Sequence, residues 1–319
     1  MPPRKSKIKV DIVIPVYNEE EVIEHTHASL RAVIDPLPYD FTVYYVDDGS
    51  TDATAGSLAA LAKTDTRIVT LEFSTNFGHQ AALTAGLDAA TGDFVVSMDA
   101  DGQHPPEMIP EMIRLFEQGY DIVQAQRAEE AARGLSFKKF TSSAFYAFLN
   151  RISGTQMIPG AADFRGLSRQ AVDALKAMPE YHRFLRGMVS WIGYKSIVLP
   201  YHEPKRVAGR TKYSPGKMMR LAMDAIFSFS LVPLYIGLST GILFMVLAGA
   251  QILSVVYLWL TKQTDLIVPG WTSVLTFLLV GNGIIMILLG FIGVYLGYVF
   301  QEVKRRPLYL LKKRKNAAE

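Results

Sequence analysis

The chain contains no cysteine, which excludes disulfide bonds and any chemistry that depends on a thiolate. It also lacks the two common glycine-rich phosphate-binding signatures. No Gly-x-Gly-x-x-Gly follows the first strand-like run, and no Gly-x-x-x-x-Gly-Lys-Ser/Thr occurs anywhere. Any phosphate that the protein binds is therefore expected to be held by a metal ion and by basic side chains.

Two further absences narrow the possible functions. The histidines show no spacing to serine and aspartate that is typical of a nucleophilic triad, so we interpret most of them as surface or structural residues. They are His25, His27, His79, His104, His182 and His202. Residues 1–9 are basic and lead into a strand-like alternation instead of the apolar core of a signal peptide, so we expect no export of the N-terminus.

Charged residues are missing from two long stretches in the last third of the chain. None occurs in residues 231–260 or 266–300, and each run exceeds the roughly 20 apolar residues that cross a bilayer. Soluble core helices rarely need such uncharged runs, so we predict two transmembrane helices. The length of 319 residues allows about two domains, of which residues 1–204 form the first.

Basic residues flank both uncharged runs. The first is preceded by Lys205, Arg206, Arg210, Lys212, Lys217 and Arg220, and the second is followed by Lys304, Arg305, Arg306, Lys312, Lys313, Arg314 and Lys315. This excess predicts that both termini and the N-terminal domain lie on the cytoplasmic side of an inner (plasma) membrane. Residues 205–230 are predicted to be an amphipathic interfacial segment, and 301–319 a basic cytoplasmic tail. The net charge of +3 then indicates a membrane surface and no nucleic-acid partner.

Residues 1–204 alternate short β-rich runs with helix-like stretches, which is typical of an α/β domain with a mostly parallel sheet. The predicted strands are residues 10–16, 41–46, 68–73, 94–98 and 122–125. Each is followed by polar residues: Asn18-Glu19, Asp47-Asp48-Gly49-Ser50, Asn76-Phe77-Gly78, Asp99-Ala100-Asp101 and Arg127. Because parallel strands end at one edge of the sheet, we expect these side chains to converge on one ligand site.

Asp99 and Asp101 directly follow a buried run. Hard divalent cations such as Mg²⁺ or Mn²⁺ take oxygen ligands, commonly one or two carboxylates together with substrate phosphates. The turn therefore predicts a metal site, with a solvated turn as the alternative. In the turn from Asp47 to Asp52, carboxylates can accept from a base N–H or ribose hydroxyls, and Ser50 or Thr51 can cap the next helix.

Five segments together resemble the motifs of glycosyltransferase family 2. They are Pro15-Val16-Tyr17-Asn18-Glu19, Asp47-Asp48-Gly49-Ser50-Thr51-Asp52, Asn76-Phe77-Gly78, Asp99-Ala100-Asp101-Gly102-Gln103 and Ala162-Asp163-Phe164-Arg165. Over essentially its whole length the chain is similar to the polyprenyl-phosphate glycosyltransferases, relatives of dolichyl-phosphate mannosyltransferase that include bacterial members with two C-terminal spans.

The resemblance implies a GT-A fold, a UDP- or GDP-sugar donor and a Mg²⁺ or Mn²⁺ cofactor. It implies transfer with inversion to the phosphate of a membrane polyprenol, of undecaprenyl or dolichyl type, for cell-envelope glycan modification. It is also compatible with a homotetramer.

The resemblance further implies roles for individual residues. Nucleotide-sugar binding would fall to Pro15, Tyr17, Asn18, Glu19, Asp47, Asp48, Gly78, Gln80 and Asp99, and metal binding to Asp99, Asp101 and Gln103. The catalytic residues would be Asp99, Asp101, Asp163 and Arg127. The acceptor phosphate would be held by Arg127, Lys139, Arg165, Arg206, Arg210 and Lys212, with Arg127 and Arg210 favoured first.

The role of Asp163 stays open between a base, a metal-facing carboxylate and an orienting carboxylate. The second pKa of a phosphate monoester is about 6, so the acceptor is largely ionised at neutral pH and hardly needs a general base. We therefore favour an orienting or electrostatic role. A metal that bridges the donor phosphates would stabilise the charge that builds on the leaving group.

Two other functions are compatible with parts of the chain. A processive polysaccharide synthase would carry a Gln-x-x-Arg-Trp motif and more spans, whereas the corresponding region reads His182-Arg183-Phe184-Leu185-Arg186-Gly187. A catalytically inert membrane scaffold with the same fold is disfavoured by the intact pair Asp99 and Asp101. The donor sugar, its nucleotide and the polyprenol length stay open at this stage.

Overall fold

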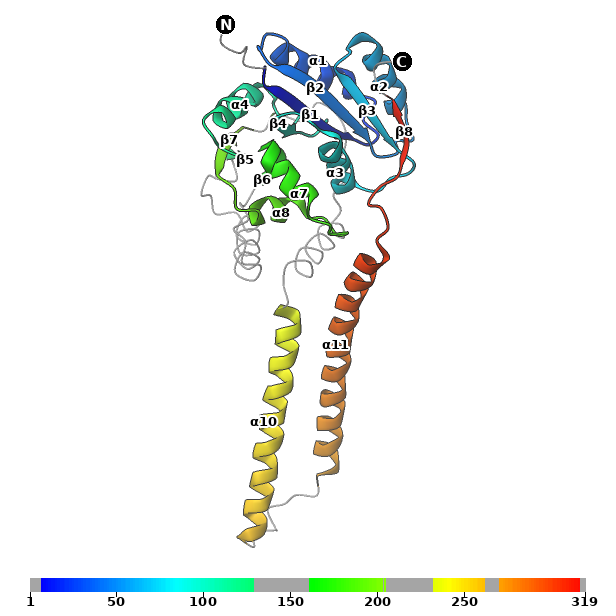
Figure 1. Ribbon diagram of the computed structural model, residues 1–319. Coiled ribbons are helices and arrows are strands. Elements are labelled where there is room, and N and C mark those ends of the chain that lie inside the picture. The colour runs from blue at the N-terminus through cyan, green and yellow to red at the C-terminus, as the bar shows by residue number, and fades with distance from the viewer. Residues whose placement is uncertain (1–6, 129–160, 203, 205–231, 262–269, 316–319) are drawn as a thin grey trace. The chain divides into compact units, whose positions relative to one another are not determined.

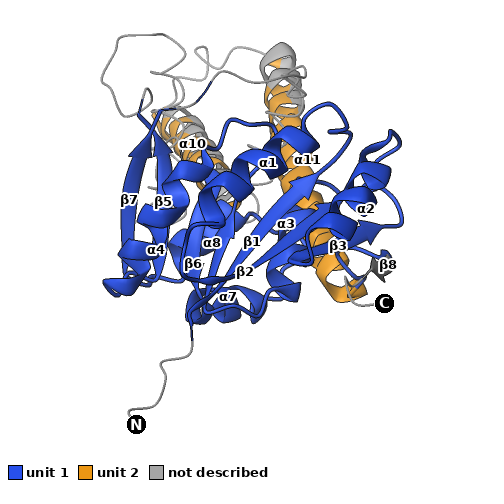
Figure 2. Ribbon diagram, turned by 90° about the horizontal axis from the view of Figure 1, so that it is seen from above, with its two compact units in different colours: residues 1–221, 306–319 blue, residues 222–305 orange. Residues whose placement is uncertain are grey.

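The computed structural model describes residues 7–128, 161–202, 204, 232–261 and 270–315. The chain divides into two compact units, which Figure 2 colours separately: residues 1–221 with 306–319, and residues 222–305. The first unit thus contains the expected α/β domain together with the C-terminal end of the chain. The expected interfacial segment, residues 205–230, lies outside the described residues.

The first unit is built on an eight-stranded sheet in the order β7-β5-β6-β4-β1-β2-β3-β8 (Figure 1). Its strands are β1 Lys9–Val16, β2 Asp40–Asp47, β3 Ile68–Phe73, β4 Phe94–Ser97, β5 Ile122–Arg127, β6 Ala161–Ser168, β7 Ser196–Tyr201 and β8 Leu311–Lys315. Its helices are α1 Ile23–Ile34, α2 Thr54–Thr64, α3 His79–Ala89, the short 3-10 helix η1 Pro106–Met108, α4 Ile109–Glu117, α7 Arg169–Lys176 and α8 Leu185–Trp191.

All five strands expected from the sequence are present, and the sheet is mostly parallel, which confirms the α/β class. β1 pairs in parallel with β2 and β4, β2 with β3, and β5 with β7. β6 is antiparallel to β4 and β5, and β8 is antiparallel to β3. Because β6 runs the opposite way, its first residues lie at the edge where β4 and β5 end; Arg165 pairs with Ser97, and Ala161 with Gln126.

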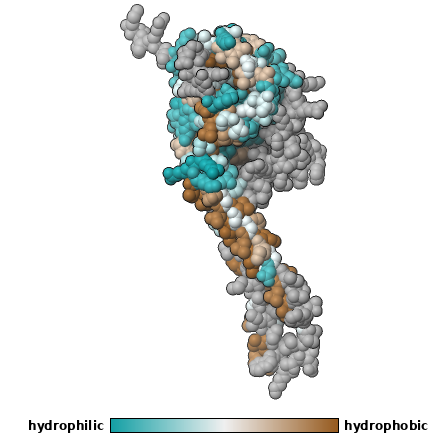
Figure 3. Space-filling model, turned by 90° about the vertical axis from the view of Figure 1, so that its right-hand side faces the viewer, coloured by the Kyte–Doolittle hydropathy of each residue, from teal (hydrophilic) through white to brown (hydrophobic). Residues whose placement is uncertain are grey.

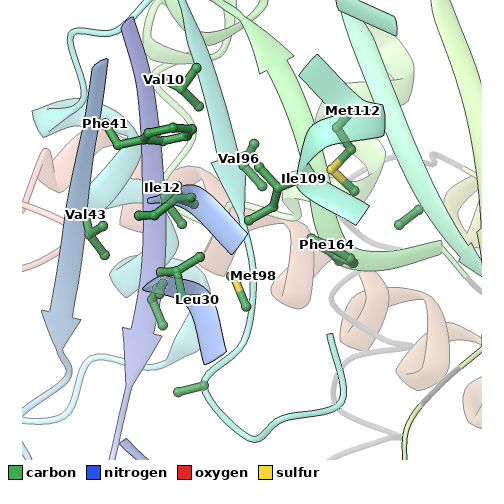
Figure 4. Close-up of a cluster of buried hydrophobic side chains, with 14 of the residues drawn as sticks. Val10, Ile12, Leu30, Phe41, Val43, Val96, Met98, Ile109, Met112 and Phe164 are labelled. Carbon is green, nitrogen blue, oxygen red and sulfur yellow. The ribbon is translucent and has the colours of Figure 1, made fainter. Parts of the chain in front are cut away.

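The hydrophobic core packs against the central strands (Figure 4). Every residue of β1 after Lys9 is buried, as expected for a central parallel strand covered on both faces. Ile12 of β1 and Val96 of β4 share this core with Leu30 of α1 and Ile109 of α4. A close-packed sheet of this kind holds its strand ends rigidly, so the loops that leave those ends start from fixed positions.

The described residues of the second unit form two helices, α10 Val232–Leu260 and α11 Trp271–Lys304. Within the described part of the chain, one segment, Val280–Lys304 of α11, is long and apolar enough to cross a membrane. Its large apolar side chains are exposed, among them Leu296 and Val303, and Figure 3 shows apolar surface along the helical part of the molecule. Exposed apolar surface of this extent indicates apolar surroundings. The other expected span coincides with α10 and stays a prediction.

The C-terminal tail holds a strand that the sequence did not predict. Leu311–Lys315, in the expected basic tail, forms β8 at the edge of the sheet. It pairs with β3, from Thr70 opposite Lys315 to Phe73 opposite Leu311. Lysine is depleted in strands but common on sheet edges, where its charge discourages pairing with other chains. From the sequence alone, a lysine-rich run therefore indicates a solvated tail, and only its pairing with β3 identifies it as a strand.

Candidate active site

The loop after β1 is fastened to the loop after β2. Asn18 has a left-handed backbone, with φ of 53°, which asparagine tolerates better than most residues. Its Oδ1 accepts from the Thr51 N–H at 2.9 Å, and its own N–H donates to Ser50 Oγ at 3.0 Å. The Glu19 N–H donates to Thr54 Oγ1 at 2.9 Å. Asn18 and Glu19, both expected to bind the nucleotide, are thereby held at one edge of the sheet.

Asp47 and Gly49 give the loop after β2 its shape. Asp47 Oδ1 accepts from the Ser50 N–H at 2.9 Å, which closes the turn between these two residues. Gly49 has φ of +70°, and a Cβ there would lie 2.6 Å from the carbonyl carbon of Thr75. The loop after β2 therefore packs directly on the loop after β3, an approach that glycine alone permits.

Asp48 holds the loop after β3. Its carboxylate accepts from the N–H groups of Phe77 at 2.7 Å and Gly78 at 2.9 Å, and from Asn76 Nδ2 at 3.0 Å. Burial raises the pKa of Asp48, while the hydrogen bonds from Phe77 and Gly78 act in the opposite direction. The carboxylate is thus engaged by the neighbouring loop, and its contact with a donor base or ribose stays a prediction.

The turn that carries Asp99 and Asp101 is organised by His104. The Asp99 N–H donates to His104 Nδ1 at 2.8 Å, and the Gln103 N–H donates to Asp101 Oδ1 at 3.1 Å. His104 is buried and stacks on Phe164, with 5.0 Å between ring centroids. Burial lowers the pKa of His104, and an accepting Nδ1 requires the neutral tautomer protonated at Nε2. A neutral histidine therefore fixes the backbone of the expected metal turn.

His79, the first residue of α3, lies between two carboxylates. Its Nε2 is 3.5 Å from Asp99 Oδ1 and 3.5 Å from Asp163 Oδ2. Burial opposes the charge, but Asp99 and Asp163 outweigh it and raise the pKa of His79 to about 9. His79 is therefore a cation at neutral pH. No spacing in the sequence singles it out; the available signal was its place directly after the strand-end segment 76–78.

Asp163, near the start of β6, is enclosed by positive charge. Arg186 donates from Nε to Oδ1 at 3.1 Å and from Nη2 to Oδ2 at 3.0 Å, and Arg165 donates from Nη2 to Oδ1 at 2.6 Å. Burial opposes ionisation, but Arg186, His79 and Arg165 hold the pKa of Asp163 well below its usual range. Such a carboxylate does not take up a proton at neutral pH, so the geometry favours an orienting role over a general base.

Arg186 is a second residue of the site that the sequence did not reveal. It lies on α8, in the region where a processive polysaccharide synthase would carry its Gln-x-x-Arg-Trp motif. Gln80, expected to bind the donor, accepts at Oε1 from the Leu185 N–H at 3.2 Å and so joins α3 to the start of α8. This contact places the Arg186 segment beside the loop that begins α3, a proximity that no motif spacing encodes.

The other expected residues have varied positions. Pro15 is part of β1, Tyr17 follows that strand, and Arg127 ends β5 at the same sheet edge. Arg165 is 3% exposed, and its guanidinium donates to Asp163 and to the Ala162 carbonyl, so its contact with an acceptor phosphate stays a prediction. Four expected phosphate ligands lie outside the described residues: Lys139, Arg206, Arg210 and Lys212.

The turn of Asp99 and Asp101 fits a divalent cation whose coordination is completed by the substrate. Among the described residues, no group of three or more His, Asp or Glu side chains is arranged to hold a metal by itself. The Oδ1 atom of Asp99 is buried and accepts no hydrogen bond from the described residues. Two carboxylates with donor phosphates match the way in which Mg²⁺ is commonly bound, so the donor set fits.

Comparison with known proteins agrees with this picture. The family model for glycosyl transferase family 2 matches residues 11–175. The chain is 40% identical to the Bacillus subtilis (strain 168) protein described as uncharacterized glycosyltransferase YkcC, over 96% of this chain and 94% of that protein. It is 37% identical to the bactoprenol glucosyl transferase of Shigella phage SfX, over 97% of this chain and 100% of that protein.

Among solved structures, the chain is similar to glucosyl-3-phosphoglycerate synthase from Mycobacterium tuberculosis, in complex with Mn²⁺, UDP and glucosyl-3-phosphoglycerate. It covers 70% of this chain and 80% of its own, with 20% sequence identity and a TM-score of 0.48. The family match agrees with the GT-A type that was expected for the sheet domain. From the family match and the identity to full-length relatives, the chain belongs to glycosyltransferase family 2.

Proposed function

We propose that the protein is a membrane-bound inverting glycosyltransferase that moves a sugar from a UDP- or GDP-sugar to a polyprenyl phosphate. The supporting observation is the cluster of Asp99, His79, Asp163 and Arg186 at the strand ends. It occurs in a chain that resembles a bactoprenol glucosyl transferase over nearly its whole length. The product, a polyprenyl-phosphate-sugar, would serve cell-envelope glycan modification.

In the proposed reaction, an oxygen of the acceptor phosphate attacks the anomeric carbon of the sugar. The bond from that carbon to the donor diphosphate breaks, and the nucleoside diphosphate leaves with the electron pair. Attack on the face opposite the leaving group inverts the configuration. The acceptor oxygen is already an anion at neutral pH because its second pKa is about 6, so no protein base has to remove a proton. This is consistent with Asp163 held as an anion.

Asp99 and Asp101 would hold the Mg²⁺ or Mn²⁺ ion, with Gln103 beside them. When bound, the ion supplies Lewis-acid stabilisation of the negative charge that develops on the diphosphate. His79 and Arg186 bring further positive charge to the same place, and Asp163 orients both side chains through its two oxygens. A preorganised cation next to the reacting phosphates lowers the barrier without reorganisation during the reaction.

We assign donor binding to the loops after β1, β2 and β3. Their hydrogen bonds to one another hold the loops in place before a donor arrives, which reduces the entropy that binding costs. The residues proposed for this role are Pro15, Tyr17, Asn18, Glu19, Asp47, Asp48, Gly78 and Gln80.

The sheet supports a membrane topology with paired crossings. β8 follows α11 in the chain but pairs with β3, so the segments before α10 and after α11 belong to one folded unit. A crossing by α11 alone would separate β3 from β8 across the membrane, which is incompatible with their pairing. We therefore propose that α10 crosses as well. Its 29 residues rise about 44 Å as a helix, enough for a hydrocarbon core of about 30 Å.

The segments before α10 and after α11 would lie on the same side of the membrane, and their basic residues favour the cytoplasmic side. The catalytic domain would then face the cytosol at the inner (plasma) membrane. The acceptor phosphate would then meet basic side chains at the membrane surface. We propose Arg127 and Arg210 first, and after them Lys139, Arg165, Arg206 and Lys212. A homotetramer is compatible with this arrangement.

The proposal is tested with purified full-length protein, a short polyprenyl phosphate and a panel of UDP- and GDP-sugars labelled in the sugar. We expect one donor to transfer its label to the lipid, one sugar per phosphate, with inverted anomeric configuration by NMR. A growing polymer would identify a processive synthase instead. No transfer from any donor would leave the scaffold as the better description.

A further inference from the structure

Tyr309 lies in the tail that leads to β8, yet its side chain contacts the sheet domain. Its ring stacks on Phe73, with 5.1 Å between centroids and 7° between planes, and its hydroxyl donates to Asp88 Oδ2 at 3.1 Å. Burial and the Asp88 carboxylate raise the pKa of Tyr309 to about 12, so the hydroxyl remains a donor at neutral pH. Phe73 ends β3 and Asp88 lies in the last turn of α3. Tyr309 thus joins two elements that flank one loop.

That loop, residues 74–78, is the one that holds Asp48. Phe73 meets Phe77 edge to face, with 5.7 Å between ring centroids. The Phe77 and Gly78 N–H groups donate to the Asp48 carboxylate. Residues 74–76 are exposed, and on the side of Asp48 the loop is held by Gly49 packed against Thr75 and by Asn76 Nδ2 donating to the Asp48 carboxylate. The row of rings Tyr309, Phe73 and Phe77 supplies the anchor on the side away from Asp48.

Protection of the sheet edge does not account for these contacts. A strand that only covers β3 needs backbone pairing, which β8 provides from Leu311 to Lys315. The Ser74 N–H extends the pairing by donating to the Leu310 carbonyl at 2.9 Å. Tyr309 precedes this paired segment, and its contacts are made by the side chain. They hold Phe73, directly before the loop, and Asp88, in the last turn of α3, and edge protection requires neither contact.

We propose that Tyr309 is a positioning residue for the donor site, which holds loop 74–78 through Phe73 and Phe77 in the form that binds the nucleoside diphosphate of the donor. The inference rests on the proposed donor roles of Asp48 and Gly78. It follows that the C-terminal tail completes a pocket whose other loops come from the N-terminal third of the chain. His79 directly follows this loop as the first residue of α3, and Asp88, which accepts from the Tyr309 hydroxyl, lies in the last turn of the same helix.

The test compares Tyr309→Ala with Tyr309→Phe in the purified full-length protein. Dissociation constants for UDP and GDP are measured by calorimetry, and KM is measured separately for donor and acceptor. Tyr309→Ala should weaken binding of the accepted nucleotide about tenfold and raise donor KM in parallel, with acceptor KM nearly unchanged. Tyr309→Phe keeps the ring stack and should stay near wild type. Lys312→Ala removes an exposed tail ion pair to Glu72, 2.9 Å long, and is the matched control without effect.

Opposite results would overturn the inference. A Tyr309→Ala protein that is less thermally stable but binds nucleotide with unchanged affinity, or one in which both KM values rise equally, assigns the residue a purely structural role. If Tyr309→Ala does not fold, Phe77→Leu leaves tail and β3 intact, and unchanged affinity there is equally decisive. Calorimetry does not depend on turnover. If the wild-type protein makes no lipid product but Tyr309→Ala still weakens nucleotide binding, the proposed reaction is refuted and the inference about Tyr309 stands. A wild-type protein that binds neither nucleotide overturns the inference.

Discussion

Arg186 meets Asp163 at two points, with Nε 3.1 Å from Oδ1 and Nη2 3.0 Å from Oδ2. This fork geometry is the strongest arrangement available to an arginine and a carboxylate, and Arg165 adds a third bond at 2.6 Å. The same carboxylate faces His79. Asp163 therefore acts as the centre around which three cations are oriented, and its charge is compensated before any substrate binds.

The first prediction concerns the fork. Arg186→Lys keeps the positive charge but loses the two parallel N–H groups. Neither the Asp163 carboxylate nor the substituted side chain is then held in a fixed orientation. We expect kcat/KM to fall by a factor of ten or more, which corresponds to loss of a charge-assisted contact of about 1.5–3 kcal/mol. Steady-state kinetics measure the effect.

The control for this variant is Arg114→Lys. Arg114 makes an equivalent fork with Glu111 on the exposed surface of α4. Exposed ion pairs of this kind contribute little, so this substitution should change neither kinetics nor stability. Wild-type kcat/KM in Arg186→Lys would mean that the fork has no part in the reaction.

The second prediction concerns His104. His104→Ala leaves the Asp99 N–H without its acceptor, an unsatisfied group that costs about 1–3 kcal/mol. We expect a lower melting temperature and a higher metal concentration for half-maximal activity, because the turn of Asp99 and Asp101 loses its support. His25 is exposed, so His25→Ala serves as control. An unchanged metal requirement in a destabilised His104→Ala would restrict that histidine to packing.

The five predicted strands were predictable because buried strands require mostly apolar residues, and these runs are mostly apolar. Runs such as residues 10–16 and 94–98 are apolar apart from Asp11 and Ser97, as is typical of central parallel strands, and both form strands of the sheet. β6 was not predictable in this way, since it carries Asp163 and Arg165 in its interior and reads as a polar motif. β8 consists mostly of basic residues, and only its pairing with β3 makes it a strand.

The site residues that lie at strand ends were predictable from the sequence. Asp99 and Asp163 come together because β6 runs antiparallel to β4, and their motifs marked them in advance. His79 of α3 and Arg186 of α8 both contact the Asp163 carboxylate, and no local spacing in the sequence relates them to it. Long-range electrostatic partners of this kind become visible only when the topology is known.

The third prediction is a pH dependence of stability. Arg67 donates to Asp65 at 2.7 and 2.9 Å and lowers the pKa of that buried carboxyl to about 2, from an ordinary value of 3.8. A depressed pKa stabilises the fold above the unfolded value, and this contribution is lost as pH falls through the folded one. Between about pH 4 and pH 2 the free energy of unfolding should therefore decrease by about 2 kcal/mol from this group.

Asp65→Asn should remove that segment of the pH dependence. Urea titrations at several pH values give the free energy of unfolding for both proteins. The difference between wild type and variant should be largest above pH 4 and should shrink as the solution is acidified. A constant difference across this range would contradict the assignment to the Asp65 carboxyl.

The fourth prediction concerns Arg210, whose role is inferred from the sequence alone. Arg210→Ala removes a charge-assisted contact worth roughly 1.5–3 kcal/mol, so the KM for polyprenyl phosphate should rise about tenfold or more. Donor KM should stay nearly constant. A generic lipid-surface charge is worth about 1 kcal/mol and gives no acceptor selectivity. Equal weakening of donor and acceptor, or rescue by anionic lipid, would transfer the acceptor role to Arg127.

We propose above all that the protein transfers a sugar to a lipid phosphate at the turn of Asp99 and Asp101. The most direct measurement counts labelled sugar recovered in lipid when purified protein receives its donor with a polyprenyl phosphate or with the matching polyprenol lacking phosphate. We expect product only with the polyprenyl phosphate, and we expect a chelator to abolish it, as does Asp101→Ala in a protein that folds normally. Product from the unphosphorylated polyprenol, or full turnover by Asp101→Ala in metal-free buffer, would contradict it.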